Sequence, residues 1–489
     1  MEKQMEAVSN SRIGSEAARI ACRIRSATTV TVVSHIDADG ISAASIASSA
    51  LERAKIPHDV LFFKKLDEAA VDSLIKLSSE ALVWLTDLGS SHSSRLAGED
   101  FVITDHHHAS ESDFAVDGSS DQAFFLPFAC RYHLNPHLFG YSGDRDISGS
   151  GLAFLVSLGM DAENEDLVKL AIIGAIGDMQ DSDMRRLTGL NAEIAKFGAK
   201  RGRIERRYDL RLFGTQTRPI QRLIEYCSDP MIPGLTGDGP ACDDFLRSLR
   251  IPLSSENGAP TRWCDLNSGE RRRIITGLSR KILEGGGIEK DVERLMGEIY
   301  IFPEEEVGSP LREAREFATL LNSCGRNDMP ELALEICKGD RRSALENAYS
   351  LLRTHRENIS NAINFVRQMG VGTKGRVQHF HCADQVKDTI VGIIAGMLLG
   401  SGEIDPSKPV VGFAISKEED GRFKIKASIR GSRHLVEMGL NLASAVKSAA
   451  ESVSGVGGGH SVAAGATLPL GSEDRFLAAL DAEISKQLA

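Results

Sequence analysis

The chain lacks three features that mark large classes of protein: paired cysteines, long hydrophobic runs and abundant aromatic residues. Its eight cysteines are scattered with no Cys-x-x-Cys, which argues against a disulfide framework and a thiolate zinc site and favours a reducing compartment. The longest apolar stretch, 389–400, is too short to cross a bilayer and is interrupted by glycines. The N-terminal segment is polar and does not read as a signal peptide. We therefore expect a cytoplasmic protein without a membrane-spanning segment.

Charge and aromatic content give no general sign of nucleic-acid binding. The net charge is −11, and the 6% of aromatic residues offer no clear platform for stacking bases. One segment, 184–211, is nevertheless basic; its cations are Arg185, Arg186, Lys196, Lys200, Arg201, Arg203, Arg206, Arg207 and Arg211. This segment is either a solvated helix face or a linker helix that guides the phosphates of a nucleic-acid strand.

The length of 489 residues predicts about three domains, and a composition of 42% hydrophobic and 26% charged residues excludes a mainly disordered chain. Short β-branched runs alternate with helical segments in the first part, which predicts a mostly parallel sheet. We expect an α/β fold with four regions: a parallel-sheet domain at 1–183, a basic helical linker at 184–225, a helical middle domain at 226–370 that docks a partner or guides substrate, and a smaller α/β domain at 371–489.

Acids and histidines follow several of the predicted strands and one apolar helix. Asp37 and Asp39 follow the first strand, Asp87 follows the third, Asp105-His106-His107 follows the fourth, and Asp178 follows a nearly all-apolar helix. Because parallel strands present their carboxyl ends at one edge of a sheet, these side chains are expected to meet there. Carboxylates with imidazole suit a hard or borderline divalent cation. The alternatives are a helix cap at Asp37-Ala38-Asp39, histidines that cap a polar loop, and a surface turn at Asp178.

A glycine run near the C-terminus provides a second candidate site. Gly457, Gly458 and Gly459 precede His460 and a run of small residues that we expect to form a helix. Backbone N–H groups of such glycines, together with a helix N-terminus, can bind an anion. We interpret the run as a phosphate or nucleotide site; the alternative is a flexible linker.

Assembled in this order, the motifs resemble those of the DHH phosphoesterase superfamily, specifically its RecJ-like branch and the archaeal RecJ-like nucleases associated with GINS. Asp37-Ala38-Asp39-Gly40 is similar to the first motif, Asp87 to the second, Asp105-His106-His107 to the third and Gly177-Asp178 to the fourth. The segments Asn135-Pro136-His137 and 315–326 also look RecJ-like. Ser428-x-Arg430 and the glycine run resemble the accessory DHHA1 substrate-binding domain.

The resemblance implies a two-metal phosphodiesterase that uses Mn²⁺, with Mg²⁺ and Co²⁺ as alternatives. The implied metal ligands are Asp37, Asp39, Asp87, His106 and Asp178. Asp105 would orient His106, and His107 would stabilise charge on the phosphorus or protonate the leaving oxygen. The implied substrate-binding residues, across a cleft between two lobes, are Ser428, Arg430, Gly457, Gly458, Gly459 and His460.

One position departs from the pattern of the superfamily. Many members carry a metal-binding histidine four residues before the first acid of the Asp-x-Asp pair, and here that position is Val33. His35, two residues before Asp37, is the candidate substitute.

The expected activity is that of an exonuclease on single-stranded DNA or RNA that releases mononucleotides and works with the replication machinery, with GINS or other replicative-helicase components as candidate partners. A 5′-to-3′ direction is favoured by analogy with bacterial RecJ. Two alternatives stay open: a phosphodiesterase for oligonucleotides or cyclic dinucleotides, and a non-catalytic scaffold, because a eukaryotic replicative-helicase component has this fold without the chemistry.

Overall fold

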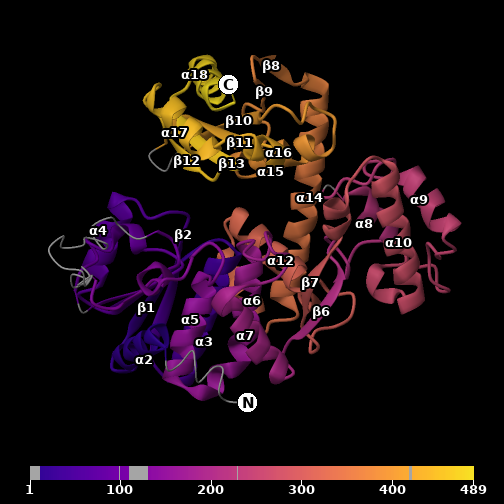
Figure 1. Cartoon of the computed structure of the whole chain (residues 1–489). Coiled ribbons are helices and arrows are strands. Elements are labelled where there is room, and N and C mark those ends of the chain that lie inside the picture. Colours follow the sequence, from indigo (N-terminus) through magenta and orange to yellow (C-terminus); the bar gives the residue numbers. More distant parts are fainter. Residues whose placement is uncertain (1–10, 99, 109–129, 228, 418–420, 489) are drawn as a thin grey trace, which may run out of the picture. The chain divides into compact units, whose positions relative to one another are not determined.

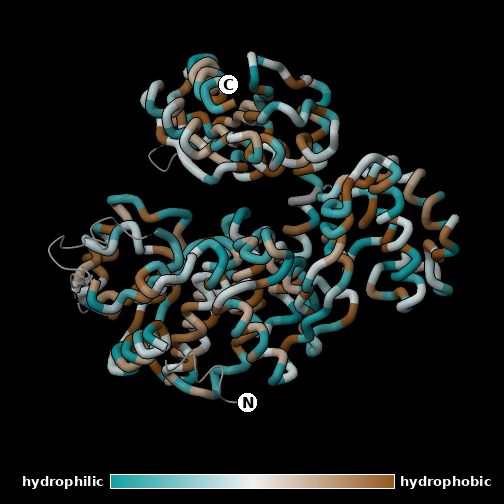
Figure 2. Tube along the Cα trace, viewed as in Figure 1, coloured by the Kyte–Doolittle hydropathy of each residue, from teal (hydrophilic) through white to brown (hydrophobic). Residues whose placement is uncertain are grey.

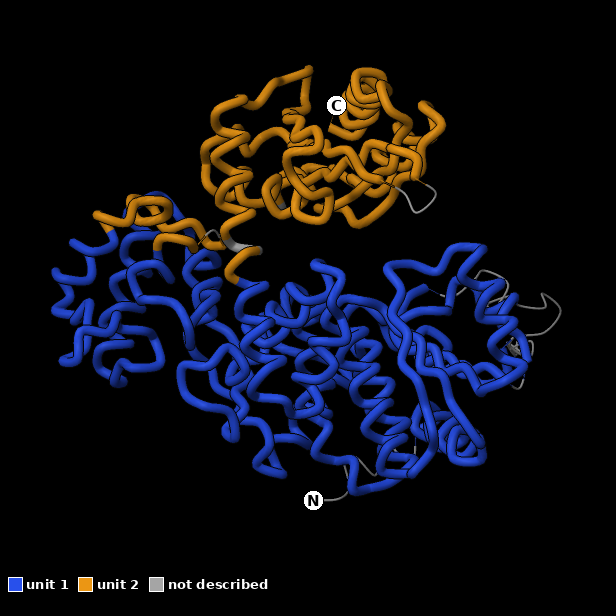
Figure 3. Tube along the Cα trace, turned by 180° about the vertical axis from the view of Figure 1, so that it is seen from behind, with its two compact units in different colours: residues 1–224, 242–352 blue, residues 225–241, 353–489 orange. Residues whose placement is uncertain are grey.

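A computed structural model describes residues 11–98, 100–108, 130–227, 229–417 and 421–488. The chain divides into two compact units (Figure 3): unit 1 comprises residues 1–224 and 242–352, and unit 2 comprises 225–241 and 353–489. The boundary at 352/353 falls inside one long helix, α14 (Ser343–Met369). Each unit has its own hydrophobic clusters.

Unit 1 is built on a five-stranded sheet of order β2-β1-β3-β4-β5, in which every neighbouring pair is parallel. The prediction of a parallel sheet is therefore confirmed. Its strands are β1 (Val30–His35), β2 (His58–Phe63), β3 (Leu82–Thr86), β4 (Phe101–Thr104) and β5 (His133–Leu134). The order places β1, β3 and β4 side by side, so the chain leaves three adjacent strands at the same edge.

Side-chain alternation along the strands separates two hydrophobic clusters. Val32 and Trp84 join one cluster, whereas the next residue of each strand, Val33 and Leu85, joins the other. The second cluster is completed by α4 (Glu68–Leu77). The helices that contribute to the first cluster are α2 (Arg12–Arg25), α3 (Ala38–Arg53), α5 (Gly149–Met160), α6 (Val168–Gly177), α7 (Gly189–Lys200), α12 (Ala314–Arg326), α13 (Pro330–Cys337) and the start of α14. The sheet is thus covered by helices on both faces, as a parallel sheet requires.

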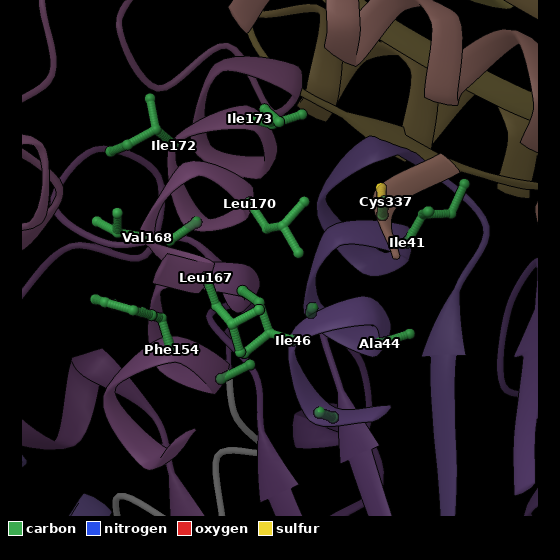
Figure 4. Close-up of a cluster of buried hydrophobic side chains, with 14 of the residues drawn as sticks. Ile41, Ala44, Ile46, Phe154, Leu167, Val168, Leu170, Ile172, Ile173 and Cys337 are labelled. Carbon is green, nitrogen blue, oxygen red and sulfur yellow. The ribbon is translucent and has the colours of Figure 1, made fainter. Parts of the chain in front are cut away.

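The helices α3, α5 and α6 form the densest part of the first cluster. Figure 4 shows Ile46 of α3 beside Phe154 of α5 and Leu167, the residue just before α6. The helix α6 carries apolar residues all round, and eight of its ten residues are buried. A helix buried on every side is held rigidly, so the acid that follows it, Asp178, has a well-defined position.

The basic segment is not one continuous helix, and the prediction of a linker helix is wrong for its second half. Residues Gly189–Lys200 are helical as α7, but Glu205–Leu210 form β6, which pairs antiparallel with β7 (Met296–Ile301). The residues of β6 alternate between half-buried and exposed positions, the period of a strand rather than of a helix. The rest of the region is mainly helical, as expected; its helices are α8 (Ile220–Glu225), α9 (Gly239–Ser248), η5 (Trp263–Asp265), α10 (Ser268–Glu284) and α11 (Glu289–Glu293).

Unit 2 contains a six-stranded mixed sheet of order β12-β13-β11-β10-β9-β8 in which only β9 and β10 pair in parallel. The strands are β8 (Gly372–Lys374), β9 (Val377–His381), β10 (Val410–Lys417), β11 (Phe423–Arg430), β12 (Val456–Gly459) and β13 (Ala463–Leu468). The helices are α15 (Asp388–Gly400), α16 (Arg433–Glu437), α17 (Leu442–Glu451) and α18 (Glu473–Gln487), and Figure 1 labels them around the sheet. The predicted smaller α/β domain is confirmed.

The small residues after His460 form a strand, so the expected helix at this place is wrong. Ala463–Leu468 is β13, which pairs with β12 and with β11. The run alternates half-buried and buried residues, and its alanines fit between two neighbouring strands rather than on a helix surface.

Hydrophobic and hydrophilic residues alternate closely along the whole trace (Figure 2). Among the residues that the structure describes, none of the helices has both the length and the apolar character needed to span a bilayer.

Candidate metal centre

The carboxyl ends of β1, β3 and β4 bring together the acids and histidines that the sequence singles out. Within the described residues, three groups have ligand atoms within 4.8 Å of one another: Asp87 with His106 and His107, His35 with Asp37 and Asp87, and Asp39 with His106 and Asp178. Asp87 belongs to two of these groups, and so does His106. The groups therefore overlap and form one continuous cluster.

Asp87 lies at the centre of this cluster in an unfavourable environment. Its side chain is 1% exposed, and neither carboxylate oxygen accepts a hydrogen bond from a described residue. Its backbone φ is +61°, in the left-handed region that a non-glycine residue rarely adopts. Burial, with the nearby charges of Asp39 and Asp37, raises the pKa of Asp87 well above its usual range. A carboxylate buried without donors is relieved either by taking up a proton, as the raised pKa indicates, or by a nearby cation.

His106 connects the carboxylates. Its Nε2 lies 3.2 Å from Asp87 Oδ1, 3.7 Å from Asp178 Oδ2 and 3.8 Å from Asp39 Oδ2. Its Nδ1 lies 2.7 Å from the main-chain oxygen of Gly143, which leaves Nε2 to face the acids. Burial opposes the charged ring, but Asp178, Asp39 and Asp105 together raise the pKa of His106 to about 9.

The structure shows a supporting residue, Gln180, that sequence reasoning missed. The Nε2 of Gln180 donates to the Gly143 oxygen at 2.7 Å and to Asp178 Oδ2 at 2.9 Å, and its Oε1 accepts from Asn191 at 2.6 Å. Gln180 thus holds an acid and the carbonyl that orients His106. Its closeness to Asp178 in Gly177-Asp178-Met179-Gln180 was the available signal, but the contact with Gly143 depends on tertiary structure.

Asp105 is hydrogen-bonded to His107 and not to His106. The expectation from the resemblance that Asp105 orients His106 is therefore wrong. Asp105 Oδ1 lies 2.8 Å from His107 Nδ1, and Asp105 Oδ2 accepts the main-chain N–H of Ser90 at 2.8 Å. Asp105 is 1% exposed, whereas the side chain of His107 is 57% exposed. Burial disfavours the charged form of the His107 ring, but the hydrogen bond and the charge of Asp105 raise the pKa of His107 to about 9.

Asp39 and Asp37 each serve the backbone as well as the cluster. Asp39, 1% exposed in the first turn of α3, accepts the N–H groups of Gly149 at 2.7 Å and Ser150 at 3.0 Å. Asp37 is the N-cap of α3 and accepts from Gly40 at 3.0 Å. Asp37 therefore caps the helix and also lies within the carboxylate cluster.

His35, the candidate substitute for the histidine missing at position 33, lies beside the acids. His35 Nδ1 lies 2.9 Å from Asp37 Oδ2 and 3.8 Å from Asp87 Oδ2. Val33 is fully buried in the cluster on the α4 side of the sheet. Positions 33 and 35 fall on the same face of β1, but Val33 lies within the strand and packs into the core, whereas His35 is the last residue of the strand and lies beside the acids at its carboxyl end.

Of the unit 2 residues that the sequence singles out, Ser428 and Arg430 lie on β11, Gly457 to Gly459 lie on β12, and His460 follows β12; β13 lies between the two strands. Ser428 of β11 stands opposite Gly465 of β13, which in turn stands opposite Gly458 of β12, and Arg430 stands opposite Ala463. A Cβ on Gly458 would meet nothing within 4 Å, whereas one on Gly457 would lie 2.9 Å from Ala450 of α17. His460 is exposed, and its N–H donates to the Ala463 oxygen.

The three positions of the run therefore require glycine to different degrees and for different physical reasons. Gly457 allows α17 to pack on β12, and Gly459 has a φ of +140° that disfavours a side chain. Of the three, only Gly458 leaves open space, and it lies in register with Gly465 of β13 and, one strand further, with Ser428 of β11.

The basic segment is largely neutralised by acids. The ion pairs are Lys196–Glu193, Arg201–Glu165, Arg203–Glu304, Arg206–Glu298, Arg207–Glu205 and Arg211–Asp181. These pairs weaken the positive field that would guide a strand, which favours the interpretation of a solvated face.

Comparison with known families matches three domains along the chain. The model of the DHH family, N-terminal domain, matches residues 29–175, the DHH-CID domain matches 212–296, and the DHHA1 domain matches 374–486. The chain therefore contains a DHH, a DHH-CID and a DHHA1 domain in this order. The DHH match contains every residue of the carboxylate cluster except Asp178, and the DHHA1 match contains the candidate residues of unit 2.

An uncharacterized protein of Methanocaldococcus jannaschii is 27% identical over 463 residues, 94% of each chain. Among solved structures, an exonuclease RecJ bound to manganese is 15% identical over 97% of this chain and 94% of its own, with a TM-score of 0.54. The Thermus thermophilus RecJ–Mn²⁺ complex is 15% identical with a TM-score of 0.55, and this chain spans 55% of it. CDC45 of Entamoeba histolytica is 10% identical over 97% and 98% of the two chains, with a TM-score of 0.61. These structures share the fold.

The donor set fits a divalent cation. Carboxylates and imidazoles converge with no thiolate among them, Asp39, Asp87 and His106 are buried, and Asp87 keeps both oxygens without a donor. The match to the DHH family suggests a nuclease or phosphoesterase, and the acidic groups suggest binding of a divalent metal.

Proposed function

We propose that the chain is a metal-dependent phosphodiesterase that acts as an exonuclease on single-stranded DNA or RNA and releases mononucleotides. The observation that carries the proposal is Asp87, buried without a hydrogen-bond donor where two of the three ligand groups overlap. A purely structural acid would have found donors among its neighbours, as Asp39 and Asp105 have. The 5′-to-3′ direction remains an analogy with bacterial RecJ.

The residues that would hold the metal are Asp37, Asp39, Asp87, His106 and Asp178, together with His35. The overlapping groups suit two ions that share Asp87, with Mn²⁺ proposed and Mg²⁺ or Co²⁺ as alternatives. When bound, such ions polarise a phosphodiester and supply a nucleophilic hydroxide at neutral pH.

His107 would act on the substrate itself. Its Nδ1 is taken up by Asp105, and the carboxylate favours the protonated ring, so Nε2–H is available at neutral pH. That group can donate a hydrogen bond to a non-bridging phosphate oxygen or a proton to the leaving oxygen. The buried Asp105 fixes the ring orientation.

Unit 2 would bind the single-stranded nucleic acid. The Arg430 guanidinium and the His460 ring are suited to binding a phosphate, and the Ser428 hydroxyl can donate a hydrogen bond. Gly457, Gly458 and Gly459 lie on β12, which pairs with β13, as does the strand β11 that carries Ser428 and Arg430. The replication machinery, including GINS, is the proposed setting.

The decisive experiment is Mn²⁺-dependent digestion of single-stranded DNA and matched RNA, each labelled at either end, with Asp87→Ala as control. Mononucleotides released progressively from one end, and lost in the variant, would support the exonuclease and show its direction. Hydrolysis of dinucleotides or cyclic dinucleotides alone would favour the small-substrate enzyme.

A scaffold is the second candidate, because the fold extends over nearly the whole of CDC45. The retained acids argue against it. Absence of hydrolysis on every substrate, with no metal bound at the carboxylate cluster in calorimetry, would favour the scaffold.

A further inference from the structure

Unit 1 contains a second polar cavity, away from the carboxylate cluster, whose lining suits an anion. It has a volume of about 220 Å³ and lies against β6 and β7, with walls from the loop at 215–216, from η5 and from α10. None of the cluster acids or histidines lines it.

Three arginines line the cavity, and one of them has no acidic partner. Arg207 pairs with Glu205 at 2.5 Å, and Arg271 pairs with Asp209 at 3.1 Å. The guanidinium of Arg312 donates to the main-chain oxygens of Pro303 and Glu305 and forms no ion pair with a carboxylate of the described residues. Arg312 is thus the lining arginine that forms no ion pair, although Glu205 lies close enough to interact with its charge and Glu316 accepts the main-chain N–H of the lining residue Gln216.

The cavity also contains a buried donor without a partner. Thr215 is 2% exposed and lines the cavity, and its Oγ1 has no hydrogen-bond partner among the described residues. Because an unpaired buried hydroxyl is costly, we expect Thr215 Oγ1 to bond to a water or a ligand in the cavity. A hydroxyl can donate to an oxyanion, and the three arginines favour a negative ligand.

The remaining wall strengthens this preference. Ile299, Ile301 and Val307 are apolar, and the Trp263 ring lies under the Arg271 guanidinium at 5.4 Å. Such walls lower the local dielectric and strengthen charge interactions. Burial raises the pKa of the Cys264 thiol to about 11, so the thiol stays neutral and does not repel an anion.

We propose that this cavity binds a phosphate group, either inorganic phosphate or the phosphate of a small phosphomonoester, with Arg312 as the main charge and Thr215 Oγ1 as a donor. Small-molecule pockets usually measure ~300–1,000 Å³, so this smaller space suits a compact anion and not a polymer strand. The proposal does not depend on the chain being a nuclease.

The test is calorimetric titration of the full-length, metal-free protein with inorganic phosphate and, separately, with AMP. The background variant Arg430→Gln removes the candidate phosphate residue of unit 2. We expect saturable binding of at least one ligand, weakened about tenfold or more by Arg312→Gln and about threefold or more by Thr215→Val. Tighter binding of AMP would identify a phosphomonoester as the ligand, and equal or tighter binding of phosphate would identify the free anion.

Arg272→Gln is the matched control, because Arg272 is exposed on the same helix as Arg271, outside the cavity, and loses the same charge. Intrinsic fluorescence gives a second readout, since Trp263 is one of only two tryptophans and touches the cavity. The proposal is overturned if neither ligand binds, or if Arg312→Gln and Thr215→Val bind as tightly as Arg272→Gln while unfolding at the same temperature as the parent.

Discussion

Asp105 Oδ1 lies 2.8 Å from His107 Nδ1 and also accepts the main-chain N–H of His107 at 3.1 Å. One buried carboxylate therefore fixes both the backbone and the ring of an exposed histidine. Since Nδ1 is occupied, Nε2 is the nitrogen left for a ligand. This pairing separates the two adjacent histidines: His106 faces the acids, and His107 is free to face a substrate.

We expect His107→Gln to lower the rate of hydrolysis by about 10²–10⁴-fold, because a positioned acid or charge-stabilising donor contributes that much. Metal binding should be nearly unchanged, since Asp39, Asp178 and His106 remain. The measurement is kcat at saturating nucleic acid beside Mn²⁺ titration calorimetry. His434→Gln, an exposed histidine of unit 2, is the control; equal activity of the two variants would contradict the role of His107.

Asp87→Asn should abolish the stabilisation by metal without destabilising the metal-free protein. The variant removes a buried charge that has no donor, so its metal-free Tm should equal or exceed that of the parent. A ligand at 100 times its Kd stabilises a protein by about 2.7 kcal/mol, and this gain should disappear. Thermal unfolding with and without Mn²⁺ measures both effects. A persisting Mn²⁺-induced rise in Tm would show that the ion binds elsewhere.

Glu313 provides a pH dependence outside the cluster. Burial raises the pKa of Glu313 to about 7, and its side chain is 4% exposed. A raised pKa means that the folded state holds the proton more tightly, so this contribution to stability is complete below about pH 4.5 and is lost as the pH rises through 7. Glu313→Gln should therefore gain up to about 3 kcal/mol relative to the parent between pH 5 and pH 8. Denaturant unfolding at both pH values checks this; a constant difference would contradict it.

The glycine run can be tested by two adjacent substitutions. Gly457→Ala places a methyl group 2.9 Å from Ala450 and should destabilise the protein by about 1–3 kcal/mol. Gly458→Ala enters open space and should leave the Tm unchanged, but it should weaken binding of a single-stranded oligonucleotide. Thermal unfolding and fluorescence anisotropy separate the two effects. Equal Tm losses would show that both glycines are needed for packing.

The strand-end rule located most of the cluster from sequence. Apolar β-branched runs predicted β1, β3 and β4, and the acids that follow them do converge. Three predictions failed because they needed partners from elsewhere in the chain. Glu205–Leu210 became a strand because β7, about 90 residues later, pairs with it. The small residues after His460 became a strand because β11 lies beside them. The Nδ1 of His106 is hydrogen-bonded to the Gly143 carbonyl, so Asp105 bonds to the Nδ1 of His107 instead.

The sequence by itself determined the parallel sheet, its order of helices and strands, and the identity of the acids and histidines at its edge, because hydrophobic periodicity and strand ends are local properties. Only the tertiary structure decided which oxygen faces which nitrogen. It left Asp87 without a donor, neutralised the basic segment with acids such as Glu298 and Glu304, and left Arg312 without one. Hydrogen bonding and charge compensation depend on residues far apart in the chain, and the sequence pattern does not contain their positions.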